Sequence, residues 1–383
     1  MIIRVLVTVL LLSSIAMEAS TLNEAFKNAK IDGYIRGSYQ SHDIKGDKTY
    51  NDDAIGGKLH IETGEVYTIS GGASFYTSNS IYYNDNRGLV PFRGENKKSY
   101  TILGEAYIKS EFGNSLIKIG RQEIDTPFAQ IDDIGVVPNT FESAIFINKD
   151  ILDTTIFLAQ IQKMAGVDAD IVDRFTNINE NRGMQSFGVT YEGIKDLSLS
   201  GWYYNLDKAE ISSISYLEAN YENSSNIFSY GFGVQYAKEN YREDKDSNIY
   251  GVNISGGINS IGLSLSSAYT KVNGNKASSG FGGGPFFSNS EYLIIDNAGA
   301  NGRAFWYGLE YECSNIGVNG LNIGLGKVTL TTKDNKNATE IDFIASYKID
   351  DNIKMHLIAS NLDGDSVGEY NAKHIRIFAN YNF

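Results

Sequence analysis

Charged side chains recur at every second position in several short segments of this chain. The basic set comprises Arg36, Lys58, His60, Lys354, His356, His374 and Arg376, and the acidic set comprises Glu105, Glu218, Glu310, Glu312, Glu340 and Asp342. Because side chains alternate between the two faces of a β-strand, charges with this spacing share one face. On the inner wall of a water-filled barrel they would set up a transverse field, with carboxylates following the basic track and ammonium groups facing the acidic wall. The alternative is that these charges pair across adjacent strands and only keep the wall hydrated.

The sequence gives little support to other kinds of chemistry. It has no Gly-x-Ser-x-Gly motif for an outer-membrane hydrolase, and the glycine-rich segment 280–287 lacks the helix with Lys and Ser or Thr that a phosphate loop needs. Segment 167–170 begins like a calcium loop but has neither its glycine nor its bidentate Glu. A single cysteine, Cys313, excludes an internal disulfide framework and a Cys-based zinc cluster. We therefore expect no enzyme activity, no catalytic residue, no cofactor and no metal site.

The end of the chain is typical of a strand that faces lipid on one side and water on the other. Ile375, Ile377, Ala379, Tyr381 and Phe383 share one face, and the other face carries His374, Arg376, Asn380 and Asn382. A terminal aromatic residue of this kind fits the last strand of an outer-membrane β-barrel. Phe383 is the expected contact for the barrel assembly machinery.

The start of the chain predicts export. A positive segment up to Arg4 precedes an apolar run from Val5 to Ile15 and then small residues, so we expect a signal peptide over residues 1–19, cleaved after Ala16 or Ala19. No later stretch approaches the roughly 20 apolar residues that a membrane-spanning helix needs. An exported chain can then cross a membrane only as a closed barrel, because lipid satisfies no backbone hydrogen bond.

Composition agrees with a barrel and excludes several other classes. The net charge of -13 argues against non-specific nucleic-acid binding, and 25 Tyr, 19 Phe and 39 Gly beside 4 Pro indicate a glycine- and aromatic-rich β protein. Tight turns are predicted at 64–65, 112–114, 149–150, 193–196, 223–226, 257–260, 314–320 and 350–352. Connections that are mostly longer and more polar are predicted at 41–52, 78–99, 122–142, 165–183, 239–246, 272–301 and 363–371, with short ones near Asp207 and Lys333. The pattern predicts a transmembrane antiparallel β-barrel of about 18 strands over residues 20–383, with both ends on the periplasmic side.

The third long connection has the composition of a loop that folds into the barrel. It mixes apolar with acidic residues, and an ordinary surface loop has little use for the apolar ones, which are Phe128, Val136, Val137 and Phe141. We therefore expect this connection to fold inward against the wall. A loop packed over the rim is the alternative here. For the seventh connection, 272–301, an inward loop and a surface loop remain equally open.

The run Gly120-Arg121-Gln122, Asp125-Thr126-Pro127, Asp133 and Pro138-Asn139-Thr140-Phe141-Glu142 resembles the constriction loop of the OprD family of Gram-negative outer-membrane porins. With the signal sequence, strand count and terminal Phe383, the resemblance extends over essentially the whole chain. It implies an 18-stranded barrel, a pore narrowed by inward third and seventh loops, and uptake of small carboxylates or amino acids without energy coupling. By this resemblance Asp133, Pro138, Thr140 and Phe141 belong to the constriction, and the expected constriction loop also includes Asp125, Pro127, Asp132 and Glu142. Gly135 departs from the family pattern, which often has a basic residue there, so charge selectivity at the constriction is in doubt.

The expected function is therefore a channel in the cell outer membrane for passive diffusion of small hydrophilic solutes and ions. Its partners are the lipid bilayer and the solutes. The alternative is a surface adhesin or recognition barrel with little channel activity, and the polar connection 165–183 could form such a surface. Strand patterns alone leave a monomer and a homotrimer equally open.

Overall fold

The computed structural model describes residues 19–47, 49–81, 94, 98–207, 209–364 and 371–383. The predicted signal peptide and its cleavage site lie outside these residues, except for Ala19, at which helix α2 (Ala19–Lys27) begins. Most of the connection 78–99 also lies outside them. No helix among the described residues is long and apolar enough to span a membrane.

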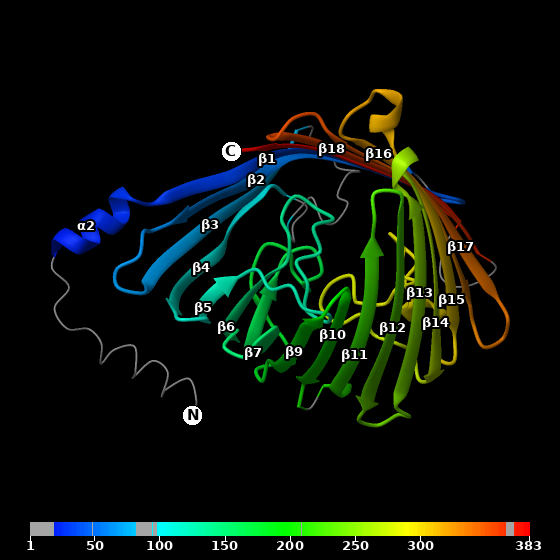
Figure 1. The fold of residues 1–383 in the computed structure, drawn as a ribbon, viewed down its shortest axis with the longest axis horizontal. Coiled ribbons are helices and arrows are strands. Elements are labelled where there is room, and N and C mark those ends of the chain that lie inside the picture. The colour runs from blue at the N-terminus through cyan, green and yellow to red at the C-terminus, as the bar shows by residue number, and fades with distance from the viewer. Residues whose placement is uncertain (1–18, 48, 82–93, 95–97, 208, 365–370) are drawn as a thin grey trace.

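The strands form one closed antiparallel barrel (Figure 1). They are β1 (Lys30–Ile44), β2 (Thr49–Glu62), β3 (Ile69–Ser80), β4 (Tyr100–Phe112), β5 (Ser115–Gln122), β6 (Thr140–Asn148), β7 (Thr154–Ala165), β8 (Thr176–Asn177), β9 (Met184–Ile194), β10 (Leu197–Asn205), β11 (Ile211–Ser224), β12 (Phe228–Tyr241), β13 (Ser247–Ile258), β14 (Leu263–Gly274), β15 (Arg303–Glu312), β16 (Leu321–Thr331), β17 (Asn337–Lys348), β18 (Ile353–Gly364) and β19 (Ala372–Asn382). Three short 3₁₀ helices, η1 (Asn259–Ile261), η2 (Ile295–Ala298) and η3 (Cys313–Ile316), lie in connections. Of these 19 strands, β8 has two residues and pairs only with β7, so the barrel wall has 18, as the sequence predicted.

The barrel closes where β1 pairs with β19, a junction that we call the seam. Its register joins Tyr34 to Asn382 and Gln40 to Arg376, and Phe383 exchanges two backbone hydrogen bonds of 3.1 Å with Gly33. Each of the eight predicted turns falls between two consecutive strands on the rim that carries both chain ends. Because outer-membrane barrels have short periplasmic turns, we take this rim as periplasmic.

The strand faces follow the predicted alternation. On β1 the side chains of Arg36, Ser38 and Gln40 are buried inside the barrel, whereas Ile35 and Tyr39 are exposed on the outer surface. The outward apolar side chains form the surface that meets lipid. The connection predicted at 41–52 is shorter than expected, because polar residues above the membrane continue the ladder to the pair Asp43 and Thr49.

Packed protein fills part of the barrel interior. A buried apolar cluster lies inside the barrel, where the connections 123–139 and 275–302 pack against inward side chains of β6, β10, β11 and β16. Both connections lie inside the ring of strands in Figure 1. Part of the interior is therefore filled by protein at the level of these loops, and the route for water is narrower than the barrel itself.

Candidate functional site: a pore narrowed by two inward loops

The first inward loop, residues 123–139, crosses the interior of the barrel. One side of it is anchored by Phe128, which is fully buried with its ring 5.4 Å from that of Tyr204 on β10 and 5.7 Å from that of Tyr216 on β11. The other side contacts β1 through Asp133. Since β11 is the tenth of the 18 strands in the wall, it lies diametrically opposite β1. The loop therefore folds inward, as its composition predicted, and it spans the lumen as well.

Arg36 holds the loop at the seam. Its Nη1 and Nη2 donate to the two carboxylate oxygens of Asp133 at 2.6 and 2.7 Å, and Nη1 also donates to the carbonyl of Gly135 at 2.6 Å. Its Nε donates to Oδ1 of Asn380 on β19 at 2.7 Å. Paired, charge-assisted hydrogen bonds of this kind are the strongest in proteins. The family resemblance leads us to expect a basic residue at the position of Gly135. The positive group beside Gly135 is instead the guanidinium of Arg36, which belongs to the barrel wall.

The second inward loop, residues 275–302, is held by a similar set of contacts. Arg376 on β19 forms an ion pair with Glu291 of the loop. On β17, Glu340 accepts hydrogen bonds from the backbone N–H groups of Tyr292 at 3.1 Å and Leu293 at 2.6 Å. The open question between an inward and a surface loop is therefore answered by the structure, which packs the loop inside the barrel.

The two inward loops also contact one another. The N–H of Gln130 donates to the carbonyl of Phe281 at 2.9 Å, and the N–H of Phe281 donates to the carbonyl of Phe128 at 3.0 Å. The ring of Phe286 lies 5.9 Å from that of Phe128. The loops therefore form one packed body across the pore, and a change in one is expected to affect the other.

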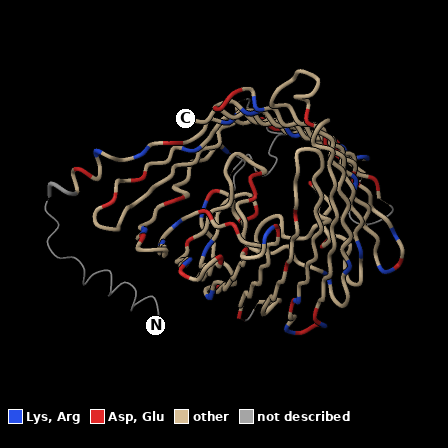
Figure 2. Tube along the Cα trace, viewed as in Figure 1, with Lys and Arg blue, Asp and Glu red and all other residues tan. Residues whose placement is uncertain are grey.

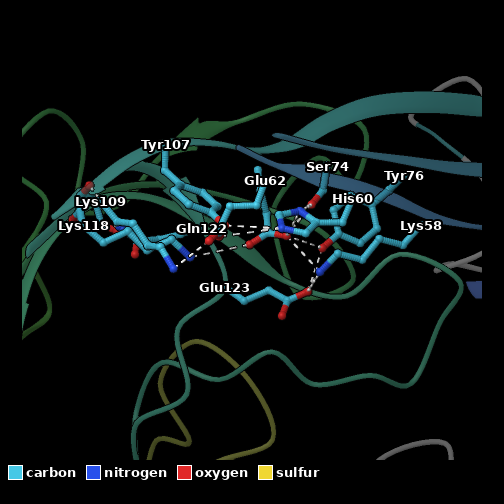
Figure 3. A network of polar contacts seen from close by, with 12 residues as sticks. Lys58, His60, Glu62, Ser74, Tyr76, Tyr107, Lys109, Lys118, Gln122 and Glu123 are labelled. Atoms are coloured by element: carbon cyan, nitrogen blue, oxygen red, sulfur yellow. Dashed lines mark hydrogen bonds and ion pairs between the residues drawn. The ribbon is translucent and has the colours of Figure 1, made fainter. Parts of the chain in front are cut away.

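A second group of basic residues, Lys58, Lys109 and Lys118, lies on β2, β4 and β5, and we call it the lysine wall (Figure 3). Lys58 Nζ lies 2.8 Å from Glu105 and 3.0 Å from Glu123, at the start of the first inward loop. Lys109 lies 2.7 Å from Glu62. Lys118 has the weakest pairing, 3.9 Å from Glu105, and its Nζ lies 3.7 Å from the centre of the Tyr107 ring. The wall alternates cationic and anionic groups along the strands.

Comparison with known proteins identifies the family. The family described as "outer membrane porin, OprD family" matches residues 77–374. The chain belongs to the OprD family. Its barrel is similar to OccK9 (OpdG) of Pseudomonas aeruginosa, with a TM-score of 0.80, 16% identity and coverage of 94% of this chain and 99% of the other. Similar coverage and identity relate it to Pseudomonas aeruginosa OpdK with vanillate, at a TM-score of 0.79, and to a BenF-like porin from Pseudomonas fluorescens Pf-5, at 0.80. A search of curated proteins found no match.

In this OprD-family chain, the residues of the basic track all occupy strand positions whose side chains point into the barrel. Their surroundings differ. Arg36 and Arg376 are buried beneath the inward loops. His374 is buried against the Tyr292 ring, with ring centres 4.1 Å apart, and His60 lies within the lysine wall, 2.7 Å from Ser74. Lys354 is exposed near the periplasmic rim, and His356 is half-buried on the same strand. The track is therefore not one continuous exposed strip.

The acidic set divides into separate groups instead of forming one wall, and Asp and Glu are spread over the barrel in Figure 2. Glu105 does not oppose the basic residues, because it lies 2.8 Å from Lys58. Glu340 and Asp342 are buried beneath the second inward loop, where Asp342 accepts a hydrogen bond from Ser290 at 2.6 Å. The other three are Glu218, opposite the seam and hydrogen-bonded to Tyr216, and Glu310 and Glu312, exposed on β15.

The predicted constriction residues occupy two kinds of position. Asp125 and Asp133 are exposed in the first inward loop, Pro127 and Asp132 are half-buried there, and Pro138 is buried. Thr140, Phe141 and Glu142 are instead the first residues of β6, because they pair with β7 opposite Ala165, Met164 and Lys163. Phe141 belongs to the buried cluster around Phe128, and Glu142 lies 3.1 Å from Lys163.

Asp132 lies where the first inward loop meets the connection 166–183. Burial, followed by the neighbouring carboxylate of Asp168, raises the pKa of Asp132 to about 7. Asn139 joins the same two segments, with its Nδ2 2.6 Å from Asp168 Oδ2 and its Oδ1 accepting from the Asp168 N–H at 3.0 Å. Within the described residues, no cluster of three or more His, Cys, Asp or Glu could hold a metal ion. Asp132 is thus a carboxyl group of the first inward loop whose charge depends on pH near neutrality.

Sequence reasoning missed Lys109, Lys118 and Glu123. The first two are direct cross-strand partners on β4 and β5. The predicted turn at 112–114 fixes this register, so counting outward from the turn could have found both. Glu123 directly follows β5, and its carboxylate accepts a hydrogen bond from Lys58. Strand alternation does not predict this contact, because it depends on the inward course of the loop.

Proposed function

We propose that this OprD-family porin admits small organic carboxylates, amino acids included, by passive diffusion along the lysine wall. The observation that carries the proposal is the difference in access between the two basic groups. The seam arginines, Arg36 and Arg376, are covered by loop carboxylates, whereas the lysine side chains keep more of their surface exposed, as Lys58 shows. A carboxylate in transit could therefore exchange with Glu105 or Glu123 as the partner of Lys58 or Lys118.

The paired charges support solutes that carry both signs. Lys58 is shared between two carboxylates, so it attracts an approaching carboxylate without binding it tightly. Glu123 is a nearby acceptor for an ammonium group. Conduction requires binding that is strong enough for entry and weak enough for release. The neighbour solved with vanillate, an aromatic carboxylate, is consistent with this solute class.

The proposal is tested with the purified protein in planar bilayers and in liposome swelling assays. We expect open-channel conductance and faster swelling with acetate, benzoate and glycine than with an uncharged sugar of similar size. Equal rates for charged and uncharged solutes would contradict the proposed selectivity. Absence of conductance from a folded, inserted barrel would contradict the channel itself and favour the recognition barrel.

A further inference from the structure

The outward face of β13–β17 contains an apolar groove of about 580 Å³. Its walls are the exposed side chains of Ile254, Leu265, Leu309, Leu325 and Ile341. Small residues such as Gly256 and Ser267 line it as well. These residues alternate with buried inward ones such as Ala304 and Glu340, so the groove faces the membrane and not the pore.

One end of the groove lies at the upper edge of the apolar band. Along β16 the outward residues are apolar as far as Leu325 and then become Lys327, Thr329 and Thr331. On β17 the residues opposite these three are Ile341, Thr339 and Asn337, so the change to polar residues occurs there one residue pair later. The polar side is that of the long loops. Lys327 therefore lies where the headgroups of the outer leaflet begin.

Of three outward cations, Lys327 lines this end of the groove, and Lys271 and Arg303 lie beyond it toward the long loops. Lys271 on β14 and Arg303 on β15 are direct cross-strand partners, and Lys327 Nζ lies 6.0 Å from the centre of the Tyr307 ring. Like charges placed directly opposite one another destabilise a sheet. Their hydrogen-bond acceptors are neutral: Lys271 donates to the Asn301 carbonyl at 2.5 Å, and Arg303 donates to Asn335 Oδ1 at 3.4 Å.

The cations lack an anionic partner within the protein as far as it is described. No Asp or Glu of those residues lies within 4.0 Å of Lys271, Arg303 or Lys327. Lys327 is four residues along β16 from Thr331, the partner of Arg303, which is about 13 Å of strand. Long side chains from both levels can reach one headgroup between them.

We propose that this surface binds a phosphate-bearing lipid of the outer leaflet, with an acyl chain in the groove and the phosphate on Lys271, Arg303 and Lys327. The apolar groove accounts for the chain, and the three uncompensated cations account for the charge of the headgroup. A cation near a membrane surface attracts anionic lipid. A second copy of the barrel is disfavoured as the occupant, because it would have to bury these cations against its own surface.

The test is native mass spectrometry of the full-length barrel in detergent, titrated with dipalmitoyl phosphatidic acid. We expect one tightly retained lipid, and retention about tenfold weaker or more in K271Q/R303Q/K327Q, because each cation near the headgroup contributes to the attraction. S267F keeps all three cations but fills the groove, and it should weaken retention as well. The matched control is K373Q, since Lys373 is also exposed at the extracellular end of its strand but lies opposite Asp43.

Three outcomes would overturn the proposal. The triple variant could retain the lipid as well as the parent protein does, or the parent could retain dipalmitoyl glycerol, which lacks the phosphate, equally well. The parent could instead form multimers that the triple variant loses, which would make the groove an interface between copies. Heat-modifiable mobility in gels confirms beforehand that each variant forms the barrel.

Discussion

The seam and the lysine wall face the same lumen but present their cations in different ways. The side chains of Arg36 and Arg376 are each 5% exposed, whereas those of Lys58, Lys118 and Lys109 are 16%, 18% and 21% exposed. Each seam arginine pairs with a carboxylate from an inward loop, while the lysines share carboxylates of the wall and the loop base. The seam cations therefore hold loops in place, and the more exposed wall cations are the ones that we propose a solute approaches.

The difference between seam and wall shows that a side chain can point into the barrel without being accessible to a solute. Arginine suits the seam because its planar fork binds a carboxylate at two points and keeps its charge when buried. Lysine suits the wall because its ammonium is a compact charge on a flexible stem, able to change partners. The paired strands β1 and β19 thus close the barrel and position both inward loops.

The largest effect is expected from R36Q/R376Q, which removes both seam contacts. Release of the inward loops should raise single-channel conductance about two- to fivefold, because the constriction sets the resistance of the pore. The uncompensated Asp133 and Glu291 should also shift the reversal potential toward cation preference. The measurement is planar-bilayer conductance in a salt gradient, and conductance equal to that of the parent would contradict the role given to the seam.

A smaller effect, on selectivity rather than conductance, is expected from K58Q/K118Q. Removal of both cations leaves Glu105 and Glu123 less compensated, so anion permeability relative to cations should fall about threefold at low salt and less at high salt. Conductance should change little, because neither side chain holds a loop across the pore. An unchanged reversal potential at low salt would mean that solutes do not pass this wall.

Some features of the seam and the lysine wall can be predicted from the sequence and others cannot, depending on whether the contacts are local or long-range. Alternation and turn composition are local, so they predicted the 18-stranded barrel, the inward phase of Arg36 and Arg376, and an inward course for the loop at 123–139. The partners of those arginines could not be predicted in this way. Asp133 and Glu291 reach the seam only because each loop returns across the lumen, a path fixed by long-range packing such as Phe128 on Tyr216. Glu105, which we predicted as part of an acidic wall opposing the basic track, instead pairs with Lys58 within the wall, as the alternative of paired wall charges allows.

The pH dependence of the inward loops distinguishes them from the wall. Burial and then Asp168 raise the pKa of Asp132 to about 7. The docked loop therefore binds this proton more tightly than a released loop would, so docking is most favourable at low pH and weakens as pH rises through about 7. Groups facing Asp132 from other elements are Arg376 and Glu291. Conductance should rise between pH 5 and pH 8, and D132N should remove most of that rise; a rise that persists in D132N would assign it to another group.

The smallest effect is expected from K354Q. Lys354 belongs to the predicted basic track, yet it is exposed near the periplasmic rim and far along its strand from the inward loops. Charges in open water are strongly screened at physiological salt, with a Debye length of about 8 Å. Conductance and reversal potential in 0.15 M salt should both stay close to those of the parent, and a shift as large as that of K58Q/K118Q would restore Lys354 to the transport route.

The most direct test of the division between seam and wall is the double variant R36Q/D133N. It removes the contact between β1 and the first inward loop but leaves the net charge of the pore unchanged. If Arg36 serves to hold the loop, conductance in planar bilayers should rise about twofold or more while the reversal potential stays at the parent value. Unchanged conductance together with a shifted reversal potential would contradict the account and return the seam arginines to the solute path.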